Sequence, residues 1–272
     1  MGDVTVIIPS RDRPRDLRRC LLALRENDLR HLREVIVVDD ASRVAVGDEV
    51  DLANLPVRVL RNDSPQGAMA ARNRAAGEAD SAILAFLDDD ALPRQDWLSV
   101  IVTALDETRG GITGRVLPFD QGVVSRARQA RYVQRYHALT EGQSVDFFAG
   151  GNSAAWRDLF DRAGGFSALG VGGDNSLVAG LERLGHPVCF VPDLVIVHRN
   201  GKGVLRAFQD AYHAGRSHPR PLPPGAILRD AIRARPAPAD PASRALNWAL
   251  QVTHLVGRGQ AASRSTARRI EV

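Results

Sequence analysis

Several residue types are scarce in this chain of 272 residues, and their scarcity narrows the class of protein. Aromatic residues make up only 5%, and no apolar run approaches the roughly 18–20 residues that span a bilayer. Only two cysteines occur, Cys20 and Cys189, far apart and each within an apolar pattern. We therefore expect buried free thiols and a cytoplasmic protein, with no signal peptide ahead of the first strand near Val4.

Lysine is almost absent: Lys202 is the only lysine, and the other basic residues among the 36 lysines and arginines are arginine. The resulting excess of arginine is consistent with phosphate recognition or with a GC-rich genome. The net charge is +4 and the pI about 9.6, but the basic residues are scattered and lack aromatic partners, so no nucleic-acid role is expected. A hydrophobic content of 44% and a charged content of 25% are typical of a soluble globular protein.

The first half of the chain alternates short β-rich runs with segments of helical spacing. Strands are predicted at 4–9, 34–38, 57–60 and 82–87, and helices at 13–29, 66–77 and 95–107. This order is typical of βαβ units and a parallel sheet. Each strand ends in polar residues, at the edge where open α/β sheets bind ligands.

The second half is less regular. It predicts a strand around Ile112, helices at 125–140, 155–163 and 174–184, and two short strands at 188–191 and 195–197. Later helices are predicted at 205–215 and 243–257, around proline-rich breaks at 219–224 and 236–241, with a frayed tail after Gly257. These patterns divide the chain into a domain at 1–200, with halves at 1–110 and 111–200, and a helical extension at 201–272.

Three consecutive carboxylates, Asp88, Asp89 and Asp90, follow the apolar run 82–87. Like charges repel one another and are costly to desolvate, so such a cluster at the end of a buried strand is suited to hold a cation. The alternative is an acidic turn in solvent.

A set of motifs in fixed order gives the chain a family resemblance. It resembles the inverting family 2 glycosyltransferases, which have a GT-A fold, over about residues 4–200. The matching segments are 6–10, 35–42, Gly67 with 71–73, 86–90 with Pro93, 150–152, 164–166, Asp174, and 191–198. The resemblance implies a mostly parallel sheet flanked by helices, a nucleoside diphosphate sugar as donor, foremost a UDP-sugar, and Mn²⁺ or Mg²⁺ as cofactor. The acceptor stays open among small molecules, glycans and peptides.

The metal would be held at the acidic run. In the family's Asp-x-Asp motif Asp90 matches the direct ligand, while Asp88 would act through water or on the donor ribose, with Asp89 beside them in the nucleotide-sugar site. His198 ends the last predicted strand, where related enzymes have a further metal ligand. A lone histidine is also common as a satisfied structural residue.

The nucleotide side of the resemblance lies at the first strands. Asp39 or Asp40 would accept a hydrogen bond from the nucleobase, although both also suit a turn or a helix start. Pro9, Ser10 and Arg11 would line the same pocket.

Phosphate and sugar contacts are expected from four further positions. The chain lacks the P-loop pattern, so phosphate binding would depend on the metal and on Arg72, which is otherwise an ordinary helix arginine. Gly151 and Asn152 would let the backbone and an amide approach the sugar. Trp156 suits either a sugar platform or the core.

Asp174 is the candidate general base, which an inverting transfer needs to take the acceptor's proton. The family's usual glutamate before it is Gly173 here, and Asp174 also suits a helix cap. This departure keeps open an inactive protein that binds nucleotide sugars. A nucleotidyltransferase is less favoured, because residues 9–14 do not form a glycine-rich loop. The extension from 201 could close over the acceptor, form a homodimer or lie on a membrane.

Overall fold

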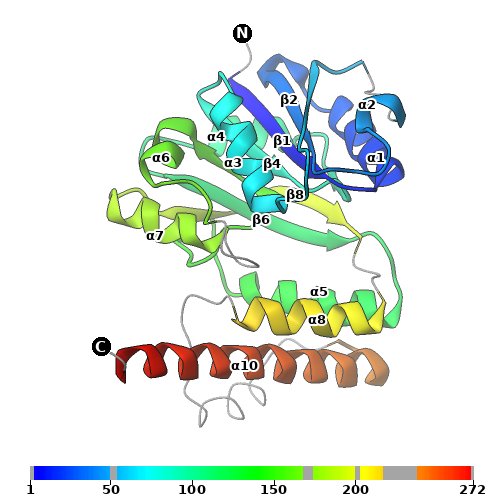
Figure 1. Cartoon of the computed structure of the whole chain (residues 1–272), viewed down its shortest axis with the longest axis vertical. Helices are drawn as coiled ribbons and strands as arrows, with labels where there is room; N and C mark the ends of the chain where they lie inside the picture. Colours follow the sequence, from blue (N-terminus) through cyan, green and yellow to red (C-terminus); the bar gives the residue numbers. More distant parts are fainter. Residues whose placement is uncertain (1–2, 50–53, 168–173, 200–202, 217–237, 271–272) are drawn as a thin grey trace. The chain divides into compact units, whose positions relative to one another are not determined.

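The computed structural model describes residues 3–49, 54–167, 174–199, 203–216 and 238–270 (Figure 1). The described residues include an eight-stranded sheet in the order β3-β2-β1-β4-β7-β6-β8-β5. The strands are β1 (Val4–Ser10), β2 (Leu32–Asp39), β3 (Val57–Arg61), β4 (Ile83–Leu87), β5 (Ala91–Pro93), β6 (Gly111–Pro118), β7 (Asn152–Trp156) and β8 (Val188–His198).

The strands of the first half are parallel, as predicted. β1 pairs with β2 on one side and β4 on the other, and β2 pairs with β3. Every residue of β1 and β4 is buried, because helices cover both faces of a parallel sheet. In the register Ser10 lies beside Asp39, and Asp39 beside Arg61. The polar carboxyl ends of neighbouring strands therefore meet at one edge.

Three pairings that involve strands of the second half are antiparallel. β7 pairs with β4 and β6, and β5 pairs with β8. The helix predicted from residue 155 was wrong at its start, because Ala155 and Trp156 complete β7 and the helix begins at Arg157. The two predicted short strands are one continuous β8. Pro192 lies outside the part of β8 that pairs with β5, which is Ile196–His198.

Helices α1 to α4, α6 and α7, with the short η1, flank this sheet within one compact unit. Those of eight residues or more are α1 (Pro14–Arg25), α3 (Ala68–Glu78), α4 (Trp97–Ala104) and α7 (Asn175–Arg183), and the shorter ones are η1 (Leu29–His31), α2 (Val46–Glu49) and α6 (Arg157–Arg162). Four phenylalanine rings form one cluster at the sheet, in which five pairs have centroids 5.0–5.8 Å apart: Phe86, Phe148, Phe160 and Phe166. Both cysteines are buried free thiols, as predicted.

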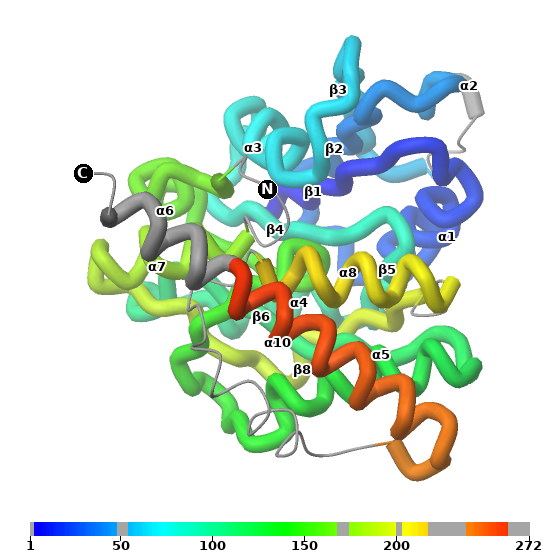
Figure 2. Tube along the Cα trace, turned by 60° about the horizontal axis from the view of Figure 1, so that its bottom comes forward, coloured from blue at the N-terminus to red at the C-terminus, as the bar shows by residue number. Residues whose placement is uncertain are grey.

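The chain forms two compact units, and the second is helical. The first consists of 1–117, 139–169 and 173–198, and the second of 118–138, 170–172 and the chain from 199 on. The second unit contains α5 (Val123–Tyr136), α8 (Val204–Arg216) and α10 (Pro241–Ile270), which pack against one another (Figure 2). The domain boundary predicted at residue 200 stays a prediction, as does the role of the extension.

Glycines allow α8 and α10 to approach closely. A Cβ at Gly215 would collide with the carbonyl oxygen of His254, and one at Gly257 with that of Tyr212. Gly257 is therefore a contact point within the helix, which continues to Ile270, and the prediction of a frayed tail beyond it was wrong.

The proline-rich stretch at 219–224 lies outside the described residues. No helix in the described part of the chain is long and apolar enough to cross a membrane.

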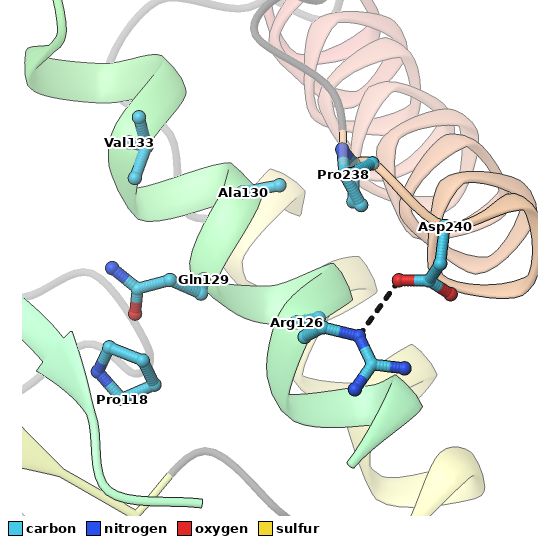
Figure 3. A pocket seen from close by; sticks show the side chains of 8 residues that line it. Pro118, Arg126, Gln129, Ala130, Val133, Pro238 and Asp240 are labelled. Atoms are coloured by element: carbon cyan, nitrogen blue, oxygen red, sulfur yellow. Dashed lines mark hydrogen bonds and ion pairs between the residues drawn. The ribbon is translucent and has the colours of Figure 1, made fainter. Parts of the chain in front are cut away.

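The second unit also contains a hollow of about 540 Å³ (Figure 3). One face of α5 lines it with residues spaced three and four apart, and the turn before α10 closes it from another side. Arg126 and Asp240 form an ion pair of 2.8 Å at its wall. The complete lining is Pro118, Arg126, Gln129, Ala130, Val133, Pro238, Ala239 and Asp240.

Candidate functional site

The acidic run leaves the sheet at the carboxyl end of β4, and its middle member is buried. Asp89 is only 5% exposed and accepts hydrogen bonds from Ser10 Oγ at 2.9 Å and from Arg13 Nη1 at 3.0 Å. Burial raises the pKa of Asp89 to about 6, against the opposing effect of Arg13. Asp89 is therefore an internal anchor between the ends of β1 and β4.

The two outer carboxylates lie close to His198, at the end of β8. One potential ligand atom from each of Asp88, Asp90 and His198 lies within 4.8 Å of the others. His198 Nε2 lies 2.9 Å from Asp90 Oδ1, and both side chains are 8% exposed, whereas that of Asp88 is 37% exposed. Two carboxylates and an imidazole fit Mn²⁺ and related hard divalent cations. β5 and β8 pair Ala91 with His198, which brings the histidine to the acidic run.

Arg72 pairs with one member of this cluster and is almost completely buried. Its side chain is 3% exposed, and its Nη2 lies 2.5 Å from Asp88 Oδ1. The Nε atom is buried and has no hydrogen-bond partner among the described residues. Gly151 faces Asp88, and a Cβ there would collide with the carboxylate. Arg72 and Gly151 thus fix where Asp88 can point.

Asp174 contacts Gly150, which in turn lies beside Arg72. It is the N-cap of α7, where its carboxylate accepts from the backbone N–H of Asn175 at 3.1 Å and of Gly150 at 3.3 Å. A Cβ on Gly150 would lie 3.2 Å from Arg72 Nη1 and 3.5 Å from Asp174 Cβ. The structure therefore brings the predicted base into the neighbourhood of the acidic run. Gly173 lies outside the described residues.

Asp39 ends β2 and is fully buried. It accepts from the backbone N–H of Ser42 at 2.9 Å and of Val46 at 3.2 Å, and from Arg61 Nη1. Burial alone would raise the pKa of Asp39, but these hydrogen bonds outweigh it and lower the pKa below its usual value. A nucleobase contact by Asp39 stays a prediction.

Asp40 holds the turn that leads into α3. It accepts from Asn62 Nδ2 at 2.7 Å and from the backbone N–H of Gln66 and Gly67 at 2.8 and 2.9 Å. Burial opposes these bonds, and the net result is a lowered pKa of Asp40. Both aspartates therefore have a turn-forming role, which the sequence offered as the alternative to base recognition.

The remaining residues predicted for the site differ in their exposure and in their contacts. Pro9 is buried and Arg11 exposed at the end of β1. Asn152 is completely buried: its Oδ1 accepts from Trp97 Nε1, and its Nδ2 donates to two carbonyl oxygens. Trp156 is partly exposed and donates to Asp106 O at 3.0 Å. The structure gives Asn152 a role within the core, and its sugar contact stays a prediction.

Sequence reasoning missed Arg13, which bridges two members of the acidic run. Its Nη1 lies 3.0 Å from Asp89 Oδ1 and 3.2 Å from Asp90 Oδ2. The order of the strands could have revealed it. If β1 is placed beside β4, an arginine shortly after β1 falls at the same sheet edge as the aspartates.

Comparison with known protein families decides where this fold belongs. The family model for glycosyl transferase family 2 matches residues 5–164, more than half of the chain. The chain belongs to this family. Among curated relatives, this family 2 chain is 28% identical over 206 residues to glycosyltransferase AglE of Haloferax volcanii, covering 72% of the chain and 66% of the relative. It is 36% identical over 143 residues to a pre-mycofactocin glycosyltransferase of Mycobacterium tuberculosis, covering 52% of the chain but only 28% of that protein.

Solved structures confirm the GT-A type of fold for the family 2 chain. Mannosyltransferase PcManGT from Pyrobaculum calidifontis, in complex with GDP-Man and Mn²⁺, matches with a TM-score of 0.65 at 23% identity, over 97% of this chain and 75% of that one. S. aureus TarS 1-349 in complex with UDP-GlcNAc matches with a TM-score of 0.58 at 16% identity, over 100% and 76% of the two chains. At these identities the likeness shows the fold alone.

Proposed function

We propose that this chain transfers a sugar from a nucleoside diphosphate sugar to an acceptor, with inversion at the anomeric carbon. The observation that carries the proposal is the convergence of Asp88, Asp90 and His198 at the carboxyl edge of the sheet. Family membership and relatives named glycosyltransferases support a transferase. The structural neighbours bound to GDP-Man with Mn²⁺ and to UDP-GlcNAc support a nucleotide-sugar donor, without deciding between the bases.

On the donor side, Asp90 and His198 would hold a divalent cation, with Asp88 at its more exposed flank. When bound, Mn²⁺ or Mg²⁺ would stabilise the negative charge of the departing diphosphate. Arg72 keeps Asp88 in place through their ion pair, and Ser10 holds the neighbouring Asp89 through a hydrogen bond. Gly151 leaves the space that the Asp88 carboxylate occupies.

On the acceptor side, Asp174 would take the proton of the incoming nucleophile. Its carboxylate accepts hydrogen bonds from the backbone N–H groups of Gly150 and Asn175, and these two bonds fix its orientation. A carboxylate oxygen has more than one lone-pair direction, so these bonds leave it able to accept a proton. An acceptor hydroxyl placed between Asp174 and the anomeric carbon would satisfy the geometry of general base catalysis.

One observation favours a second function, a nucleotide-sugar-binding protein without catalysis. Asp174 is a helix N-cap with bonds that such a role explains by itself. Gly173 replaces the acidic residue of the family's motif. The two functions differ in whether the bound donor is turned over.

The test combines binding with turnover. UDP- and GDP-sugars are incubated with Mn²⁺, and release of the nucleoside diphosphate is measured alongside thermal stabilisation by UDP and GDP. We expect Asp90→Asn to lose metal-dependent stabilisation, and Asp174→Asn to keep it while turnover falls by about a hundredfold or more.

The matched control is Asp80→Asn, which removes one carboxylate that is 87% exposed and has only long ion pairs. It should behave as the wild type in both measurements. Stabilisation without turnover in the wild type, for every donor tried, would favour the binding protein. No stabilisation by UDP or GDP with Mn²⁺ would overturn both functions.

A further inference from the structure

Arg13 holds the acidic run through a single nitrogen. Its Nη1 is shared between Asp89 Oδ1 and Asp90 Oδ2, at 3.0 and 3.2 Å. The guanidinium Nε and Nη2 make no hydrogen bond with the residues that the structure describes, and the side chain is 43% exposed. Arg72, in contrast, is 3% exposed and pairs with Asp88. Arg13 is therefore the accessible cation of the cluster.

The formal charge of the cluster depends on this residue. Three carboxylates less the two guanidinium groups of Arg13 and Arg72 leave one negative charge, with His198 neutral. A divalent cation would make the cluster positive by one unit, which suits an anionic diphosphate. Without Arg13 the cluster would carry two negative charges, and the same cation would only neutralise it.

We infer that Arg13 sets the charge of this cluster so that it takes up a divalent cation together with a diphosphate in preference to the cation alone. The inference rests on the proposed function, because it takes Asp88, Asp90 and His198 as the metal ligands. Arg13 repels the bare cation that Asp90 attracts, and its free N–H groups attract the phosphate oxygens that arrive with it. The donor and the metal are thereby bound as one species.

The experiment compares two dissociation constants in each variant. Electron paramagnetic resonance of free Mn²⁺ gives the affinity for the metal alone, and calorimetric titration with UDP, GDP or inorganic pyrophosphate in excess Mn²⁺ gives the affinity for the diphosphate. In Arg13→Met we expect the ratio of the two affinities to shift by about tenfold or more toward the bare metal. Arg13→Lys, which keeps the charge, should retain most of the wild-type ratio.

The matched control is Arg19→Met on α1, the helix that follows Arg13. Arg19 is 56% exposed with only a 3.9 Å ion pair to Asp16, and its loss changes the net charge by the same amount. Its ratio should equal that of the wild type. An equal weakening of both affinities in Arg13→Met would show a purely structural clamp and overturn the inference, as would an unchanged ratio. A wild type that binds neither Mn²⁺ nor any probe would instead overturn the proposed function.

Discussion

Replacement of Asn152 by alanine is expected to lower the free energy of unfolding by about 3–5 kcal/mol. The amide is completely buried and makes three hydrogen bonds, from Trp97 Nε1 at 2.8 Å and to the carbonyl oxygens of Arg115 and Leu194 at 2.8 and 2.9 Å. The alanine leaves the buried indole N–H without its acceptor and the two carbonyl oxygens without the amide donor, at about 1–3 kcal/mol for each buried group left unsatisfied, and adds a small cavity. This loss is a large share of the roughly 5–15 kcal/mol that keeps a domain folded.

Urea unfolding followed by far-ultraviolet circular dichroism measures this loss. The control is Gln66→Ala, an exposed amide that bonds only to Ser64 through its side chain and should cost less than about 0.5 kcal/mol. In a Trp97→Phe background, which lacks the indole N–H, Asn152→Ala should cost less than in the wild type, because no indole donor is left unpaired. A loss of unfolding free energy below about 1 kcal/mol in Asn152→Ala would refute the structural role and leave the predicted sugar contact as the remaining explanation for this residue.

Three further outcomes are expected. Gly257→Ala should lower the melting temperature, because its Cβ meets the Tyr212 backbone, whereas Gly47→Ala, with no atom within 4 Å, should not. Asp40→Asn should lower stability at neutral pH but progressively less in acid: the folded-state pKa of Asp40 is depressed, so its contribution is present above the unfolded pKa of about 3.9 and lost as the pH falls through the folded value. Cys189 should react with a thiol reagent only slowly at pH 8 until urea is added, because burial raises the pKa of its thiol.

The sequence predicted the parallel half of the sheet well, for a physical reason. Strands buried on both faces, such as β1 and β4, read as continuous apolar runs that few other structures explain. β7 was missed altogether, because Asn152 to Trp156 contains small residues that suit a helix equally well, and only pairing with β4 decides the matter. Long-range pairing is invisible to local periodicity.

The candidate site was predicted as a set of residues but not as a set of contacts. Asp88, Asp90 and His198 do lie together, and a motif match sufficed for that. The pairing of Arg13 with the acidic run depends on β1 lying beside β4, which no local pattern specifies. Asn152 stands in a glycine motif that suggests sugar contact, yet tertiary packing turns its amide toward Trp97.

The pairing of β5 with β8 also sets the order in which a growing chain can build its site. Arg13, Ser10 and Asp89 come from the first third of the chain, so their contacts can form early in synthesis. The imidazole opposite Asp90 arrives only with the last residue of β8. A nascent polypeptide that stops before β8 would contain the acidic residues but not the histidine. The histidine joins them only when β8 pairs with β5 at the edge of the sheet.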